Sequence, residues 1–105
     1  MSDARTIWKF PLALTDEQEI EMPQASKILH VDVQRVRHSD TEVVEQLFIW
    51  ALVYPEAPKV RRKVYVFGTG NPYKTEGPVD HIGTVQMAGS ALVWHVFALD
   101  ETWRR

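Results

Sequence analysis

The chain has 105 residues, of which 45% are hydrophobic, and its 12 Lys and Arg against 14 Asp and Glu give a formal net charge of -2. This size fits one domain with a core of its own, and the small negative charge excludes a global attraction to nucleic acid or to an anionic membrane. The absence of cysteine excludes a disulfide scaffold, thiolate metal ligands and a cysteine nucleophile. We expect a soluble, intracellular protein, since no long apolar segment follows the N-terminus and the longest apolar run, 47–54, is too short to span a bilayer.

Short runs of alternating polar and apolar residues fill the first part of the chain. Residues 7–10 and 17–22 predict two short strands, each followed by a proline. Residues 27–36 alternate most strictly, which is typical of a strand with one face in water and one in the core. Residues 35–41 then predict a polar hairpin loop.

The apolar segment 46–54 favours a strand, because it is rich in aromatic and β-branched residues. A helix over Thr41–Leu52 is the alternative, since residue 40 or 41 would cap it. Both faces of the strand would be apolar, so we expect it to be a central strand that is covered on both sides. Trp50 would then lie in the core.

The second half of the chain predicts three more strands. Residues 59–67 form a strand with a basic first half, and the long polar loop 68–78 follows. Residues 81–87 and 91–99 form two strands that are joined by a tight hairpin at 88–90.

About seven short strands with turn signals between them predict an all-β protein with little or no helix. We expect a single domain over residues 1–105, an antiparallel β-sandwich or jelly-roll-like barrel. Residues 100–105 are expected to be a frayed tail.

Six short sequence segments, spread over nearly the whole chain, are informative when they are taken together. They are Ile7-Trp8-Lys9-Phe10-Pro11-Leu12, Glu21-Met22-Pro23, Trp50-Ala51-Leu52-Val53, Phe67-Gly68-Thr69-Gly70-Asn71-Pro72, His81-Ile82-Gly83-Thr84-Val85-Gln86 and Leu92-Val93-Trp94-His95-Val96-Phe97. Together they resemble a small family of unknown function that is associated with tailed-phage and prophage genomes. The resemblance implies a phage accessory or virion role, in the cytoplasm of an infected host cell or in the virion, and brings no catalytic residue. Residues 35–45 fit the pattern least well and look like an insertion.

The sharpest cluster of charge is Lys59–Lys63. In a strand, Arg61 and Lys63 share one face and Arg62 points to the other. Such a patch would hold a phosphate or an acidic protein surface, and the arginines of 35–37 would join it if the hairpin folded back. The alternative is a charged edge strand that blocks association between sheets.

A glycine-rich turn follows the same strand and is the second candidate binding element. Its residues are Gly68, Thr69, Gly70 and Asn71. Their backbone N–H groups can form an anion nest, although the Lys-Ser/Thr ending of a P-loop is missing. The alternative is a strand-ending turn that needs positive φ. The turn opens the loop 68–78, which contains Tyr73 and is the expected place for function or disorder.

Two of the four histidines, His81 and His95, lie on strands that one hairpin joins. A three-residue loop at 88–90 puts both on one face, and a two-residue turn at Gly89-Ser90 puts them on opposite faces. The sequence predicts no metal site, because no third ligand belongs to this pattern. It predicts no cofactor and no catalytic residue either, since no nucleophile, base and orienting group occur together.

Trp8 and Trp103 are candidate contacts with a second copy of the chain, since Trp is enriched at interface hot spots. The alternatives are a half-buried Trp8 and a loose tail. The predicted function is that of a non-catalytic binding protein and homo-oligomer, whose partner is a host protein or a small phosphorylated, nucleotide-like ligand. Antagonism of a host defence is one such role. A virion subunit and a small metal-dependent or acid–base enzyme are the alternatives, and neither membrane nor nucleic acid is an expected partner.

Overall fold

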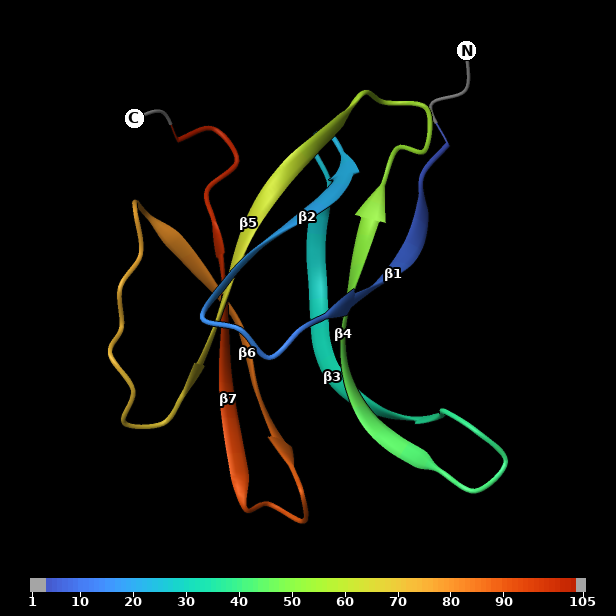
Figure 1. Cartoon of the computed structure of the whole chain (residues 1–105). Coiled ribbons are helices and arrows are strands. Elements are labelled where there is room, and N and C mark those ends of the chain that lie inside the picture. The colour runs from blue at the N-terminus through green and yellow to red at the C-terminus, as the bar shows by residue number, and fades with distance from the viewer. Residues whose placement is uncertain (1–3, 104–105) are drawn as a thin grey trace.

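The computed structural model describes residues 4–103, which form seven β-strands and no helix (Figure 1). The strands are β1 (Thr6–Leu12), β2 (Glu17–Pro23), β3 (Lys27–Arg37), β4 (Val43–Val53), β5 (Lys59–Gly68), β6 (Val79–Met87) and β7 (Leu92–Leu99). They form two antiparallel sheets: sheet A in the order β1-β4-β3, and sheet B in the order β2-β5-β7-β6. This arrangement confirms the predicted all-β, sandwich-like class. No helix long and apolar enough to cross a membrane occurs within residues 4–103.

The core lies between the two sheets and is built from alternate residues of each strand. On sheet A, the cross-strand neighbours Leu12 and Leu47 face inward together, as do Val31 and Ile49. The buried cluster consists of Leu12, Ile20, Met22, Val31, Leu47, Ile49, Val64, Val66, Val85, Met87, Val96 and Ala98. Burying one Val, Leu, Ile or Met side chain stabilises a fold by about 1.5–3 kcal/mol, so this cluster is the main source of stability.

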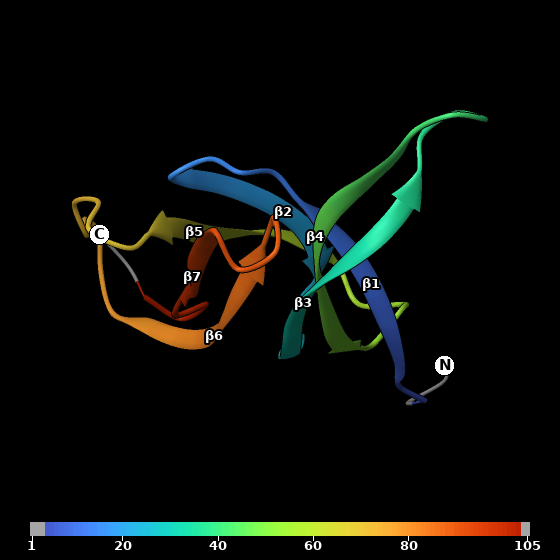
Figure 2. The same ribbon diagram turned by 90° about the horizontal axis from the view of Figure 1, so that it is seen from below.

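The chain passes between the sheets three times, through the short connections 13–16, 24–26 and 54–58. The long connection from β5 to β6 stays on sheet B instead. It has to pass β7, which lies between those two strands in the sheet (Figure 2). We call this connection, residues 69–78, the strap.

The edge strands β3 and β6 meet at one side of the sandwich. Gly83 of β6 faces Val31 of β3, and a Cβ atom at position 83 would lie 2.7 Å from Val31 Cγ1. Each strand has a β-bulge close to this contact, at Leu29 and at Ile82. A cavity of about 440 Å³ opens beside the bulges, and Arg62 contributes to its wall.

The segment 41–52 is a strand from Val43 onward and not a helix, but the expectation that this strand is covered on both sides is wrong. β4 is the central strand of sheet A, and sheet B covers only one of its faces (Figure 2). Trp50 lies on the other face, half-buried and outside the core. Side chains of neighbouring strands supply the cover there: Lys9 Nζ lies 4.4 Å from the centre of the Phe48 ring.

The β3–β4 hairpin projects beyond the sandwich, and its tip points away from the start of β5 in both views (Figures 1 and 2). Arg35 and Arg37 therefore do not join the basic residues of β5. Arg35 is the cross-strand neighbour of Glu45 in the hairpin ladder, and Arg37 Nη1 donates a hydrogen bond to the backbone oxygen of Asp40 at 3.3 Å.

Replacing Gly83 by alanine tests the contact between the two edge strands. The added methyl group would overlap Val31, which is 3% exposed and packed into the core, so we expect Gly83→Ala to lower the free energy of unfolding by about 1–3 kcal/mol. Val31→Ala removes the opposing methyl groups, and the double variant should be more stable than the two single losses predict. Urea unfolding of all four proteins measures this coupling, and strictly additive losses would contradict the contact.

Candidate functional site

Three consecutive basic residues begin β5 and alternate between its faces, as the strand pattern predicts. Arg61 and Lys63 lie on the outer face of sheet B, and Arg62 lies on the inner face. All three line a cavity of about 460 Å³ at this end of the sandwich. The C-terminal turn, residues 100–103, contributes to the same wall.

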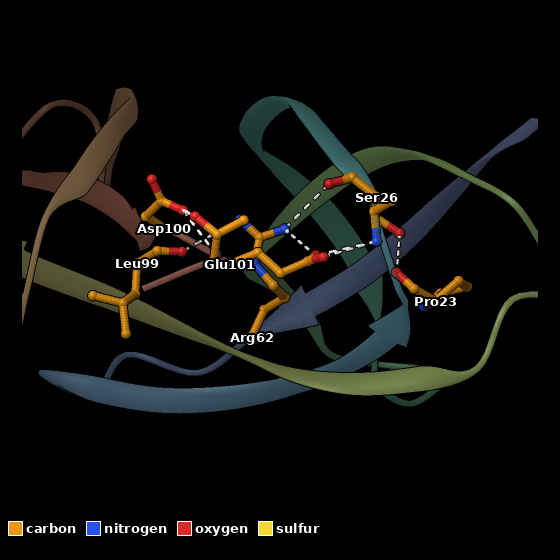
Figure 3. A network of polar contacts seen from close by, with 8 residues as sticks. Pro23, Ser26, Arg62, Leu99, Asp100 and Glu101 are labelled. Atoms are coloured by element: carbon orange, nitrogen blue, oxygen red, sulfur yellow. Dashed lines mark hydrogen bonds and ion pairs between the residues drawn. The ribbon is translucent and has the colours of Figure 1, made fainter. Parts of the chain in front are cut away.

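Arg62 is unusual among the three because its charged side chain is only 9% exposed. Its Nη1 donates to the backbone oxygen of Ser26 at 3.2 Å, and its Nη2 donates to that of Leu99 at 3.4 Å (Figure 3). Nη1 also lies 3.5 Å from Oε1 of Glu101, whose Oε2 accepts a hydrogen bond from the backbone N–H of Ala25 at 2.9 Å. One arginine thus joins β5, the β2–β3 connection and the C-terminal turn.

The other two cations are also paired. Arg61 Nη1 lies 3.4 Å from Glu19 Oε1, and both side chains are largely exposed. Lys63 Nζ lies 3.3 Å from Glu17 Oε2 and forms a second ion pair with Glu76 of the strap. The hydrogen bond to Glu76 is the main reason why the pKa of Lys63 is raised above its ordinary value of 10.5, and partial burial opposes it.

The cavity is therefore not the basic site that the sequence suggested. Its lining contains three cations but also four carboxylates, those of Glu19, Glu76, Asp100 and Glu101. One net negative charge does not attract a phosphate. The basic residues of β5 instead fasten β2, the strap and the C-terminal turn to one strand.

The C-terminal turn is ordered, so the expectation of a frayed tail is wrong for residues 100–103. The N–H of Asp100 donates to a strap carbonyl at 2.9 Å, and its Oδ1 accepts from the hydroxyl and the N–H of Thr102 at 2.7 and 2.8 Å. These two bonds to Thr102 hold the pKa of Asp100 below its ordinary value of 3.8. Residues 104 and 105 lie outside the described residues.

Both tryptophans that the sequence offered as interface contacts are half-buried within the domain. Trp8 pairs with Ala51 of β4 and lies on the inner side of sheet A beside Phe10. Trp103 packs against Gly77 of the strap, where a Cβ atom would lie 2.6 Å from the indole ring. Packing within the chain accounts for both positions.

The glycine-rich turn lies at the other end of β5, so the structure separates the two halves of the predicted binding site. Gly70 has a φ of 88°, the left-handed conformation that the glycine pattern suggests. The N–H of Asn71 donates to the carbonyl of Gly68 at 3.1 Å, and Thr69 Oγ1 forms a hydrogen bond of 2.7 Å with His95 Nε2. The turn is thus tied to itself and to β7.

Tyr73 of the strap lies on an aromatic cluster of the outer face of sheet B. Its ring centre is 5.5 Å from that of Phe67 and 5.2 Å from that of Phe97, which it meets edge-on. The strap is fastened again beyond this point, because the backbone N–H of Glu76 donates to the hydroxyl of Tyr65 at 3.1 Å. Tyr73 is nevertheless 58% exposed.

His81 and His95 share the outer face of sheet B, but neither predicted hairpin register is right. Met87 pairs with Leu92, so the loop has four residues, 88–91, and the bulge in β6 returns His81 to the face of His95.

Thr84, which sequence reasoning missed, lies between the two imidazoles. Its Oγ1 is 3.1 Å from His81 Nε2 and 3.1 Å from His95 Nδ1. A chain of hydrogen bonds therefore runs from His81 through Thr84 and His95 to Thr69 of the strap. Within residues 4–103, no group of three or more His, Asp and Glu side chains is placed to hold a metal ion.

A model of a protein family, described as Domain of unknown function (DUF7352), matches residues 3–104. The chain belongs to this family. No curated protein and no solved structure matches the chain. The match covers both sheets, the strap and the C-terminal turn, so all the contacts described above belong to the DUF7352 domain.

Arg62 and Arg61 offer a matched pair of substitutions in the DUF7352 domain. Arg62→Met removes a charged donor from two backbone carbonyls and from the carboxylate of Glu101, which still accepts from the N–H of Ala25, and we expect a loss of about 2–4 kcal/mol in the free energy of unfolding. Arg61→Met breaks an ion pair of similar length whose arginine side chain is 71% exposed, and should cost less than about 1 kcal/mol. Chemical denaturation compares the two, and equal losses would refute the assigned role of Arg62.

Lys63→Met tests how the strap is fastened. Removing the ammonium group takes the Lys63 ion pair away from Glu76, whose side chain is only 19% exposed, and we expect a loss of about 1–2 kcal/mol in the free energy of unfolding at pH 7. Because the pKa of Lys63 is raised, its contribution is fully present below pH 10.5 and is lost as the pH rises through the folded-state value.

As the pH rises from neutrality, the stability difference between wild type and Lys63→Met should therefore begin to shrink only above about pH 10.5. Lys74→Met removes the same charge from an exposed position of the same strap and serves as the control. A difference that already disappears near neutral pH would argue against this ion pair.

Proposed function

We propose that the DUF7352 domain is a non-catalytic binding protein and that the strap is its contact surface for a protein partner. Tyr73 carries this proposal. Among the described residues it is the most exposed bulky apolar side chain, yet its ring rests on Phe67 and Phe97. A rigid, exposed tyrosine offers a large contact area at a small cost in conformational entropy, which is the property of many interface hot spots.

The fastening of the strap supports the same proposal. Thr69 ties its first residue to His95, and Glu76 ties its other end to Lys63 and Tyr65. Loops on a rigid scaffold commonly carry recognition. A loop that is already ordered loses little entropy when a partner binds, so more of the contact energy appears as affinity.

A small phosphorylated ligand is less well supported as the partner. The three cations of the cavity are each paired with a carboxylate, and the glycine-rich turn lies at the far end of β5. A protein surface, by contrast, can use one projecting ring and the hydroxyl and imidazole groups around it without a concentration of positive charge.

If the domain were an enzyme, Thr84 with His81 and His95 would be its candidate catalytic group, because a hydroxyl beside two imidazoles resembles a nucleophile with a base. His95 is oriented by the hydroxyl of Thr69 and not by a carboxylate. Thr84 lines neither the cavity at β5 nor the cavity beside the bulges. Catalysis usually needs an enclosed site, so we place these groups in the binding surface.

The resemblance to phage and prophage proteins supports a biological setting for this proposal. In an infected host cell, the partner would be a host protein, and antagonism of a host defence is the role that we favour. In a virion, the partner would be another structural subunit. The same surface serves either role, because both require only recognition of a protein.

A comparison of two variants on host-cell lysate tests the proposal. We expect immobilised wild-type protein to enrich a defined host protein, and Tyr73→Ala to reduce that enrichment about tenfold or more. Leu14→Ala removes another exposed apolar side chain, 49% exposed and in the β1–β2 connection, and should leave enrichment unchanged. Quantitative mass spectrometry provides the measurement; equal enrichment by the wild type and Tyr73→Ala would sink the strap as the contact surface.

A further inference from the structure

The first residues of β5 have a neighbouring strand on one side only. β2 pairs with β5 over residues 59–65, whereas the pairing of β7 with β5 starts at Val64 and Ala98. Figure 1 shows β2 along one side of this stretch and the C-terminal turn, which is not a strand, on the other. Residues 59–63 of β5 therefore have an edge that no described strand covers. We call it the open edge.

Two hydrogen bonds show which backbone groups face the open edge. The N–H of Val66 donates to the carbonyl of Asp16 at 3.3 Å, and the N–H of Gln24 donates to the carbonyl of Pro58 at 2.8 Å. The register between β2 and β5 is unbroken between these two bonds, so the even-numbered residues of β5 direct their backbone groups toward β2. The odd-numbered residues direct theirs toward the open edge. Within residues 4–103, no backbone group pairs with the N–H or the carbonyl of Arg61 there.

The cavity of about 460 Å³ lies against the open edge. Residues 60–63 all line it, and the C-terminal turn forms the opposite wall. Consecutive side chains of a strand alternate between its two faces, so a space that meets four residues in a row lies beside the edge of the strand. A strand residue takes up about 160 Å³, from a rise of about 3.3 Å, a strand spacing of about 4.8 Å and a sheet spacing of about 10 Å. The cavity therefore has room for about three residues of an added strand.

The charged side chains of this stretch do not block the open edge. Natural proteins often protect an edge by pointing lysines outward from it, which prevents pairing with another chain. Here Arg61 Nη1 lies 3.4 Å from Glu19 Oε1 of β2, and Lys63 is paired with Glu17 of β2 and with Glu76 of the strap. These ion pairs hold both cations over the outer face of sheet B, and the backbone of Arg61 is left facing the cavity.

We propose that the open edge binds an extended peptide segment of a partner protein, which adds to sheet B as a short strand in line with β7. The N–H and the carbonyl of Arg61 offer hydrogen bonds that an extended backbone completes. The lining of the cavity carries one net negative charge, so a peptide with a lysine or an arginine is favoured over an acidic one. Arg62 already holds the C-terminal turn in place, so the site is formed before the peptide binds. This contact is separate from that of Tyr73, and the function proposed above does not require it.

Amide hydrogen exchange of the full chain, resolved by NMR spectroscopy, tests the open edge without any ligand. The N–H of Arg61 should exchange at least about 100-fold faster than the N–H groups of Arg62 and Val64, which face β2. Equal protection of all three would show that the edge is already paired, and the proposal would fail.

A synthetic peptide, Thr-Val-Lys-Val-Thr with both ends blocked, tests binding by titration of the same NMR signals. We expect a dissociation constant on the order of 1 mM, since about three paired residues bury far less than a standard interface. The Arg61 N–H should exchange more slowly in the complex, and glutamate in place of the peptide's lysine should weaken binding about threefold. The same peptide methylated on every backbone nitrogen keeps its side chains but has no N–H donors, and it should not bind. No binding of the first peptide at several millimolar, or equal binding of the methylated one, would overturn the proposal.

Two variants at one position separate the backbone of Arg61 from its side chain. Arg61→Pro removes the N–H that faces the open edge and keeps the bonds toward β2, since proline is tolerated in a strand where its nitrogen faces outward. Arg61→Met removes the same side chain and keeps the N–H. Provided that thermal melting shows a folded protein, Arg61→Pro should bind the peptide about fivefold more weakly than Arg61→Met, and equal affinities would contradict strand addition. If Arg61→Pro does not fold, the methylated peptide decides. Tyr73→Ala should bind the peptide as the wild type does, so this proposal and the proposed function can fail separately.

Discussion

One buried guanidinium holds an end of the sandwich together. Arg62 occupies an inward-facing position of β5, whose next inward positions are the fully buried Val64 and Val66. A lone charge there would cost several kcal/mol, so the fold has to bring acceptors to it. They come from Ser26 in the β2–β3 connection and from Leu99 and Glu101 at the end of the chain. The path of the chain between the sheets and its last described residues therefore depend on one side chain.

Ion pairs also decide what the outer face of sheet B can do. Lys63 is shared between Glu17 of β2 and Glu76 of the strap, so it holds an edge strand and a long loop at once. A residue used in this way is not available to a phosphate. The charge of the strand is thus used to hold the domain together, so the contact with a partner that we propose has to use the exposed aromatic and hydroxyl groups of the strap.

Much of the fold follows from local pattern, whereas the site depends on pairing between distant segments. Alternation, aromatic and β-branched content and turn signals together placed the seven strands. Alternation also put Arg61 and Arg62 on opposite faces, because side-chain direction in a strand is a local property. The neutralising carboxylates are distant in sequence. The pairing of β2 with β5 brings in Glu17 and Glu19, and the strap and the C-terminal turn supply Glu76 and Glu101. The one sequence feature that pointed to such carboxylates is the alternation of glutamates at positions 17, 19 and 21. The prediction that Trp50 lies in the core was wrong for a related reason. The side chain of Lys9, on the neighbouring strand β1, covers part of that face of β4. The apolar sequence of β4 does not show whether a single side chain or a second sheet provides such cover.

The outer faces of the two sheets are covered in different ways. On sheet A, the ammonium group of Lys9 lies over the ring of Phe48 and donates to Gln34 Oε1 at 2.9 Å, so a polar side chain covers part of the apolar surface. On sheet B, the strap covers the aromatic cluster, and the Tyr73 ring rests on Phe67 and Phe97 although 58% of Tyr73 stays exposed. A projecting ring needs a hollow on the surface that it meets, so the contact proposed for the strap requires a partner of complementary shape.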